Sequence, residues 1–155
     1  MTNPQPTLLQ DYQPYPFQPT AVDLTFHLSP GKTRVLARIA FTPNPARPGR
    51  HDLFLHGEKL RLTGASIDGT PLAPGDYTLT NEGLTVPAAR LPQGAFLWQA
   101  EVEIDPEGNT ALEGLYLSGG IFCTQCEAEG FRHITYYPDR PDVMAPFRVR
   151  IESAQ

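Results

Sequence analysis

Alternation of apolar and polar residues marks most of the chain after residue 20 and predicts β-strands. Residues 22–28 place Val, Leu, Phe and Leu at every second position, with polar residues between them. Residues 35–41 repeat the pattern with Val, Ala, Ile and Phe, after the turn sequence SPGK. Two alternating runs joined by a short turn are typical of an antiparallel hairpin.

The same reasoning predicts six further short strands, which give about eight in all. In the turn between the third and fourth of these six, Gly83 is expected to supply a positive φ angle. No β-α-β unit and no internal repeat is visible, and 17 prolines and 13 glycines favour turns over long helices. We therefore predict an all-β fold, an antiparallel β-sandwich, whose further strands lie at 51–57, 59–67, 76–80, 83–87, 96–104 and 147–151.

Alternation disappears between about residues 105 and 143, where a long irregular loop region is expected. The sequence CEAEGFRHI allows one or two helical turns, while Pro138 and Pro141 exclude a helix after it. Irregular segments of this length are uncommon in compact domains and often carry function.

The first 19 residues are rich in proline and are expected to form an extended leader without a core of its own. It is expected to lie along the surface of the domain; the alternative is a proline-rich ligand for an aromatic groove. Residues 20–155 are then one β domain, with the last strand, 147–151, at an open edge of its sheet.

Composition narrows the function classes. The chain has 155 residues and a net charge of −5, without the basic stripe that nucleic-acid binding requires. No apolar run approaches the roughly 20 residues of a membrane span, and the N-terminus lacks the features of a signal peptide. Two cysteines are too few for a secreted disulfide scaffold. The sequence predicts a soluble, cytoplasmic protein that binds neither nucleic acid nor membranes.

The two cysteines, Cys123 and Cys126, stand in C-x-x-C spacing, which alone is a weak signal. A structural zinc site needs four ligands, and only His133 lies nearby in the sequence. A redox pair needs a β-α-β context, which is missing. We interpret both cysteines as structural, with a C-x-x-C metal or redox protein as the weakest hypothesis; the other histidines are expected at surface or capping positions: His27, His51 and His56.

Two glutamates follow, Glu127 and Glu129. Residues two positions apart do not share a helix face, so they form no evident acid/base pair, and their spacing alone suggests solvated loop charges. Tyr136 and Tyr137 are expected to be packing residues. No nucleophile elbow, phosphate-binding loop or H-E-x-x-H motif is present.

The stretch from Asn109 to Phe147 resembles, almost without a gap, the matching part of bacterial aminopeptidase N, a family of zinc metallopeptidases. Its most specific part is TQCEAEGFR, residues 124–132. The resemblance implies an N-terminal, saddle-like β domain that packs on a thermolysin-like catalytic domain and closes one side of its cleft.

The family's zinc ligands (H-E-x-x-H and a later Glu) and its G-A-M-E-N motif lie further along the chain and are absent here. The resemblance therefore implies a fragment of a larger enzyme, with zinc in the parent enzyme and neither a catalytic residue nor a metal ligand in this chain. The chain alone is expected to be inactive. The alternative is a stand-alone β-sandwich binding module without catalysis.

Gln125 and Glu127 match the substrate-binding Gln and Glu of the family's T-Q-C-E motif. The resemblance implies that Glu127 faces the free α-amine of a peptide substrate and that Gln125 lines the same pocket. A carboxylate against an ammonium forms a charge-assisted hydrogen bond, which suits an exopeptidase. Cys126 then serves as a spacer between the two.

Neighbouring residues are assigned structural roles. For Glu129, a bond within the loop is as compatible with the sequence as a solvated charge. Arg132 and Asp139 are expected to fix the loop. Pro138 replaces an expected aliphatic residue, so the local turn can differ from that of relatives.

Overall fold

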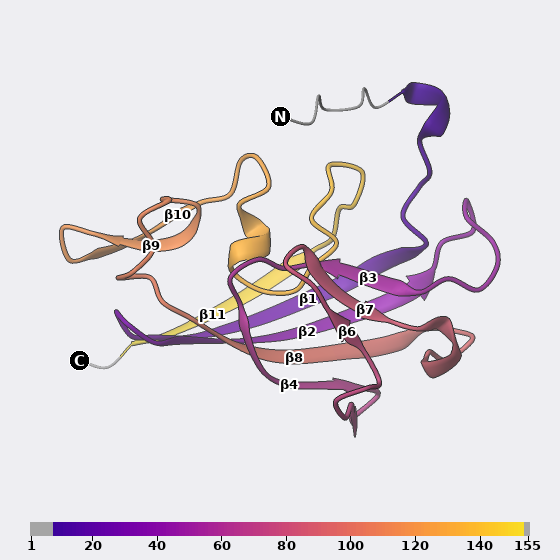
Figure 1. The fold of residues 1–155 in the computed structure, drawn as a ribbon, viewed down its shortest axis with the longest axis horizontal. Coiled ribbons are helices and arrows are strands. Elements are labelled where there is room, and N and C mark those ends of the chain that lie inside the picture. Colours follow the sequence, from indigo (N-terminus) through magenta and orange to yellow (C-terminus); the bar gives the residue numbers. More distant parts are fainter. Residues whose placement is uncertain (1–7, 154–155) are drawn as a thin grey trace.

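The computed structural model describes residues 8–153, whose regular secondary structure consists of β-strands and three short 3-10 turns (Figure 1). The largest sheet has six strands in the order β11-β1-β2-β8-β4-β5. Their bounds are β1 (Phe17–Leu28), β2 (Thr33–Pro43), β4 (Arg61–Ile67), β5 (Thr70–Pro71), β8 (Phe96–Ile104) and β11 (Phe147–Ser153).

Two smaller sheets complete the fold. A three-stranded sheet has the order β3-β7-β6, and a separate hairpin pairs β10 with β9. Figure 1 shows the hairpin projecting beyond one end of the main sheet. The remaining elements are β3 (Leu53–His56), β6 (Thr78–Leu79), β7 (Gly83–Val86), β9 (Gly114–Ser118), β10 (Ile121–Gln125) and three short 3-10 turns, η1 (Leu9–Asp11), η2 (Ala88–Arg90) and η3 (Phe131–His133). No helix within residues 8–153 is long and apolar enough to cross a bilayer.

The core lies between the six-stranded and three-stranded sheets. The predicted hairpin of β1 and β2 is present, with Leu24 opposite Ala37, and β8 continues the register with Ala100 opposite Ala37. Alternate residues of these strands are buried, and Leu55 and Leu84 meet them from the smaller sheet with no exposed surface. This confirms the predicted all-β sandwich.

The sheets are not purely antiparallel, which corrects one expectation. Strand β11 pairs with β1 in parallel, with Phe147 opposite Val22. A parallel pair needs a long crossover, and the segment 105–146 provides one between β8 and β11. Alternation reveals which residues face the core but not the direction in which a strand runs.

The expectation that Gly83 has a positive φ angle was wrong, because it is not among the positive-φ glycines of residues 8–153. Glycine is required here because a side chain would not fit. A Cβ atom at Gly83 would lie 2.1 Å from the carbonyl oxygen of Leu55 on the neighbouring strand β3. The close approach of two backbones therefore explains this glycine.

The region 105–143 contains more regular structure than expected. It holds the hairpin β9–β10, whose turn uses Gly119 and Gly120 with φ angles of 57° and 81°. A Gly-Gly pair between apolar runs is a hairpin signal. Leu115 is the one buried apolar residue of the two strands, so the alternation that marks a packed strand is missing here. The expected helical turn corresponds to η3 and the turn before it.

The first strand begins at Phe17, before the boundary expected at residue 20. Tyr15 and Phe17 are 5% and 7% exposed and belong to the core of the domain, so this end of the leader is buried and does not lie on the surface. The side-chain amide of Asn44 donates to the carbonyl oxygen of Tyr15 at 2.7 Å and holds the chain in place where it leads into β1. The expectation for residues 1–7 lies outside the described residues.

Candidate functional site

The segment with the most specific motif leaves the end of the hairpin and turns back toward the sandwich. Gln125, the last residue of β10, pairs with Gly114 on β9. Beyond it, the amide of Gly130 donates to the carbonyl oxygen of Cys126 at 2.9 Å and closes a turn that leads into η3. We call residues 126–130 the motif turn.

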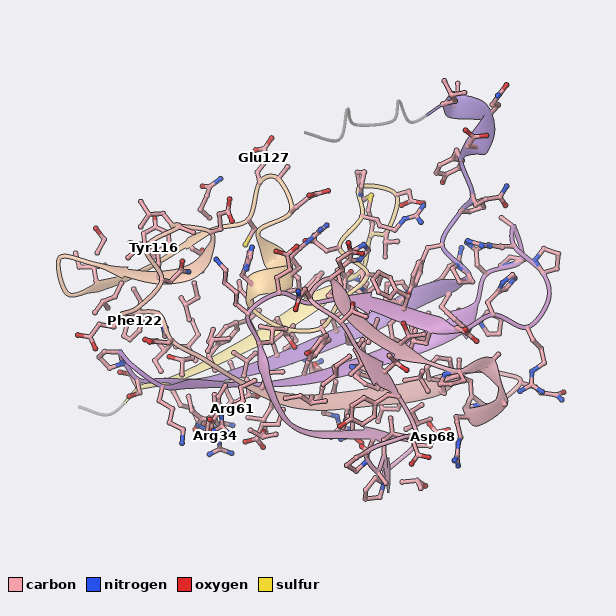
Figure 2. The ribbon with its side chains drawn as sticks, in the orientation of Figure 1. Arg34, Arg61, Asp68, Tyr116, Phe122 and Glu127 are labelled. Carbon is pink, nitrogen blue, oxygen red and sulfur yellow. The ribbon has the colours of Figure 1, made fainter. Side chains whose placement is uncertain are left out.

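Gln125 and Glu127 are brought together by the backbone of this turn. The Gln125 side-chain Nε2 donates to the main-chain carbonyl oxygen of Glu127 at 2.8 Å. The Glu127 carboxylate is exposed and, among residues 8–153, has neither an ion-pair nor a hydrogen-bond partner. Figure 2 shows its side chain at the outer end of the turn, directed away from the sheets. It is therefore free to receive a cation from outside the domain.

Glu129 has a different environment. Its Oε1 lies 3.4 Å from Nη2 of Arg132, and its side chain is 71% exposed. Its φ angle of 68° places it in the left-handed region, which turns the chain back toward η3. Of the two motif glutamates, Glu129 is thus bound within the loop and Glu127 is not.

Arg132 connects the motif turn with the segment that follows. Its backbone amide and its Nε both donate to Asp139 Oδ2, at 3.2 and 3.0 Å, and its Nη2 donates to the Asp139 carbonyl oxygen at 3.1 Å. Burial disfavours the charged guanidinium, but the hydrogen bond to Asp139 and the nearby carboxylates outweigh it and raise the pKa of Arg132. These contacts fit the loop-fixing role expected for both residues.

The segment around Asp139 is itself fixed to the sandwich. Main-chain bonds of 2.9 and 3.1 Å join His56 of β3 and Tyr137 in both directions. Nδ1 of His56 accepts the amide of Asp139 at 3.2 Å. Tyr136 and Tyr137 are 4% and 5% exposed, which confirms them as packing residues, and burial raises the pKa of Tyr137 to about 12.

Two carboxylates near this segment were not identified from the sequence. Glu58, in the connection after β3, lies 3.6 Å from Arg132 Nη1 and 3.9 Å from His133 Nε2. Glu113, next to β9, lies 3.3 Å from the same His133 nitrogen. Glu58 is distant in sequence from the motif, and no local pattern connects either carboxylate with it.

The cysteines do not provide a zinc-binding donor set. Both are free thiols, and burial raises the pKa of Cys126, which disfavours the thiolate that metals bind. In the part of the chain that the structure describes, no three His, Cys, Asp or Glu side chains are grouped to hold a metal ion. The residues present thus do not fit a zinc site.

Known proteins resemble this chain over almost its whole length. The model of the Peptidase M1 N-terminal domain matches residues 18–155. Aminopeptidase N of Caulobacter vibrioides is 51% identical over 150 residues, which cover 97% of this chain and 17% of the relative. Aminopeptidase N of Escherichia coli is 45% identical over 150 residues, which cover 96% of this chain and 16% of the relative. The chain thus spans about a sixth of the length of these relatives.

Solved structures show the same fold. The crystal structure of Legionella pneumophila aminopeptidase A in complex with aspartic acid has a TM-score of 0.84 and 31% identity, covering 92% of this chain and 17% of that one. An M1 zinc metallopeptidase from Deinococcus radiodurans has a TM-score of 0.70 at 17% identity, covering 87% of this chain and 32% of that one. The latter likeness concerns the fold alone.

Proposed function

Since the chain belongs to the family of Peptidase M1 N-terminal domains, we propose that it caps the substrate cleft of a zinc aminopeptidase that removes N-terminal residues from peptides. Its partners are then the catalytic domain of the complete enzyme and the N-terminus of the peptide substrate. The homologues that share most of this chain's length are named aminopeptidase N, which supports the reaction class.

The observation that carries the proposal is the free Glu127 carboxylate. It projects from a turn whose other charged residue, Glu129, is paired, and the Gln125 side chain holds its backbone. A peptide with a free N-terminus carries an α-ammonium, and a carboxylate binds it through a short, charge-assisted hydrogen bond. Glu127 then recognises the substrate amine, and Gln125 lines the same pocket.

The donor groups in the described part of this chain do not fit a zinc site. The proposal therefore assigns this domain to substrate recognition and the zinc ligands to the rest of the complete enzyme. An in-frame H-E-x-x-H motif downstream of residue 155 in the gene would support this division. An open reading frame that ends without one would favour a stand-alone binding module.

The direct test is Glu127→Gln in the complete enzyme, which keeps the shape of the side chain and removes its charge. A hydrogen bond to a charged group contributes about 1.5–3 kcal/mol, so kcat/KM for free-amine substrates should fall by roughly 10- to 150-fold at about 1.4 kcal/mol per decade. N-acetylated substrates should barely respond, because they lack the ammonium.

Glu129→Gln is the matched control. Its carboxylate is 71% exposed, and its one ion pair among residues 8–153 is with Arg132, so the substitution should change kcat/KM little. If Glu127→Gln leaves free-amine turnover intact while Glu129→Gln abolishes it, the assignment of the two glutamates is wrong.

A further inference from the structure

We propose that Arg132 is a positioning residue for Glu127, holding the motif turn in one place so that the carboxylate meets the substrate amine. This inference rests on the proposed function. It concerns a side chain that does not touch the substrate and acts through the turn that presents Glu127.

The two ends of the motif turn are tightly packed against each other. A Cβ atom at Gly130 would lie 2.3 Å from the carbonyl oxygen of Gln125 and 2.7 Å from the Cα of Cys126. The two ends of the turn are therefore in close contact, and Gly130 is buried between them. A displacement of the chain just after Gly130 is then transmitted to the residues that carry Glu127.

Arg132 lies two residues after Gly130 and fixes that chain mainly through Asp139, from which its guanidinium lies 3.0 Å. The guanidinium also lies 3.6 Å from Glu58 after β3, whereas its 3.4 Å contact to the exposed Glu129 contributes little to the positioning. The Arg132 carbonyl oxygen also accepts the amide of Glu58 at 3.0 Å. The side chains of Arg132 and Asp139 are 12% and 17% exposed, so the contact between these two is largely shielded from water.

The partners of Arg132 are themselves fixed to the sandwich. Asp139 donates its amide to His56 Nδ1 at 3.2 Å, and His56 is a residue of β3. A continuous set of contacts thus runs from β3 through Asp139 and Arg132 to the motif turn. The guanidinium already pairs with Asp139, Glu58 and Glu129, so Arg132 does not compete with the substrate amine for Glu127.

The geometry requires arginine rather than any positive charge. Nε, Nη1 and Nη2 each reach a different carboxylate, and Nη2 also donates to the Asp139 carbonyl oxygen. A lysine ammonium is a point charge on a flexible stem and cannot reproduce this planar arrangement. Arg132→Lys therefore keeps the charge and releases the turn.

The test is a double-mutant cycle in the complete enzyme with Arg132→Lys, Glu127→Gln and the double variant. Arg132→Lys should lower kcat/KM for a free-amine amino-acid anilide by about 10- to 100-fold, the effect of a small misplacement of a binding group. The same variant should leave the N-acetylated anilide unchanged. In the Glu127→Gln background it should add less than about a twofold loss, because it acts only through that carboxylate.

Arg34→Lys is the matched control for the loss of an arginine. Arg34 pairs with Glu101 at 2.7 Å on the main sheet, and Figure 2 shows it on the opposite side of the domain from Glu127. Both anilides should be cleaved normally by this variant. If Arg132→Lys does not fold, Asp139→Asn takes its place in the cycle, because it weakens the same contact from the other side.

The two proposals fail in different ways. If Glu127→Gln is silent, the amine-recognition role is wrong and the positioning role falls with it. If Glu127→Gln has its expected effect but Arg132→Lys is silent, only the positioning role is overturned. The same holds if Arg132→Lys lowers kcat/KM by the same factor with and without Glu127→Gln. A loss that disappears in the Glu127→Gln background supports both.

Discussion

Leu24 and Val149 face each other across the parallel pair of β1 and β11, yet Leu24 is 3% exposed and Val149 is 52% exposed. The difference arises because β11 is the outermost strand of the main sheet. Phe147 and Ile151 share the face of Val149 and are likewise exposed. The core face of the sheet therefore continues onto its edge strand, where the rings of Phe131 and Tyr137 contact Phe147 while Val149 and Ile151 stay largely exposed.

Substitution by alanine should thus affect stability differently at Leu24 and Val149. In the 155-residue chain, Leu24→Ala should lower the free energy of unfolding by about 2–5 kcal/mol, because it opens a cavity in the core. Val149→Ala removes methyl groups that already contact water and should cost under about 1 kcal/mol. Urea unfolding at several protein concentrations measures both. A loss for Val149→Ala as large as that for Leu24→Ala would show that this edge is covered in solution.

Gly83→Ala should destabilise the three-stranded sheet. The added methyl group would lie 2.1 Å from the Leu55 carbonyl oxygen, so the two strands must separate. Overpacking of this kind costs about 1–3 kcal/mol or more in the free energy of unfolding.

Gly64→Ala is the control for this substitution. Gly64 lies in β4, has no atom within 4 Å of an added Cβ and has no positive φ angle, so the change should be neutral or slightly stabilising. If both alanine variants unfold at the same denaturant concentration, the close contact between β3 and β7 is not what requires glycine.

The sequence predicted the strands whose alternate residues enter the core. Val35 and Trp98 stand in such runs and have no exposed surface, because a sheet with one buried face imposes a period of two. The hairpin β9–β10 was missed because both of its faces are largely exposed and leave no such pattern. The parallel direction of β11 was missed because alternation is the same in either direction.

The candidate site was only partly accessible to sequence reasoning. Spacing alone could not separate Glu127 from Glu129; the resemblance did, and the structure shows that Glu129 has a partner in Arg132. Glu58 contacts the same arginine from a connection far earlier in the chain. Such long-range contacts depend on how the sheets pack and leave no local signal.

The isolated chain should contain no stoichiometric zinc and should not cleave amino-acid anilides. Burial raises the pKa of Cys126, and the described residues offer no group of three suitable donors, whereas zinc sites use three or four protein ligands. Metal analysis of purified protein and an anilide assay after repurification test this. One zinc ion per chain that survives dialysis against a chelator would contradict it.

The stability of the chain should fall as the pH drops below about 6.5, partly because of His56. Burial and the nearby Arg132 lower its pKa from 6.5, although Asp139 and the backbone of Tyr137 near the ring act in the opposite direction. The unfolded chain therefore binds a proton to His56 at a higher pH than the folded chain does. Between the two pKa values the unfolded state holds more protons, so the free energy of unfolding decreases as the pH falls.

His56→Asn should reduce this pH dependence. The side-chain oxygen of the introduced asparagine can still accept the amide of Asp139, which His56 Nδ1 accepts at 3.2 Å, but it does not titrate. Urea unfolding of both proteins between about pH 5 and 7, the range in which histidine titrates, gives the two slopes, and an NMR titration of the His56 ring gives its folded pKa directly. The slope of the variant should be smaller because the proton uptake of the unfolded state at this position is lost. Equal slopes would show that folding does not shift the pKa of His56. A folded pKa above 6.5 would show that the native state favours the charged ring, whose Nδ1 cannot accept the amide of Asp139.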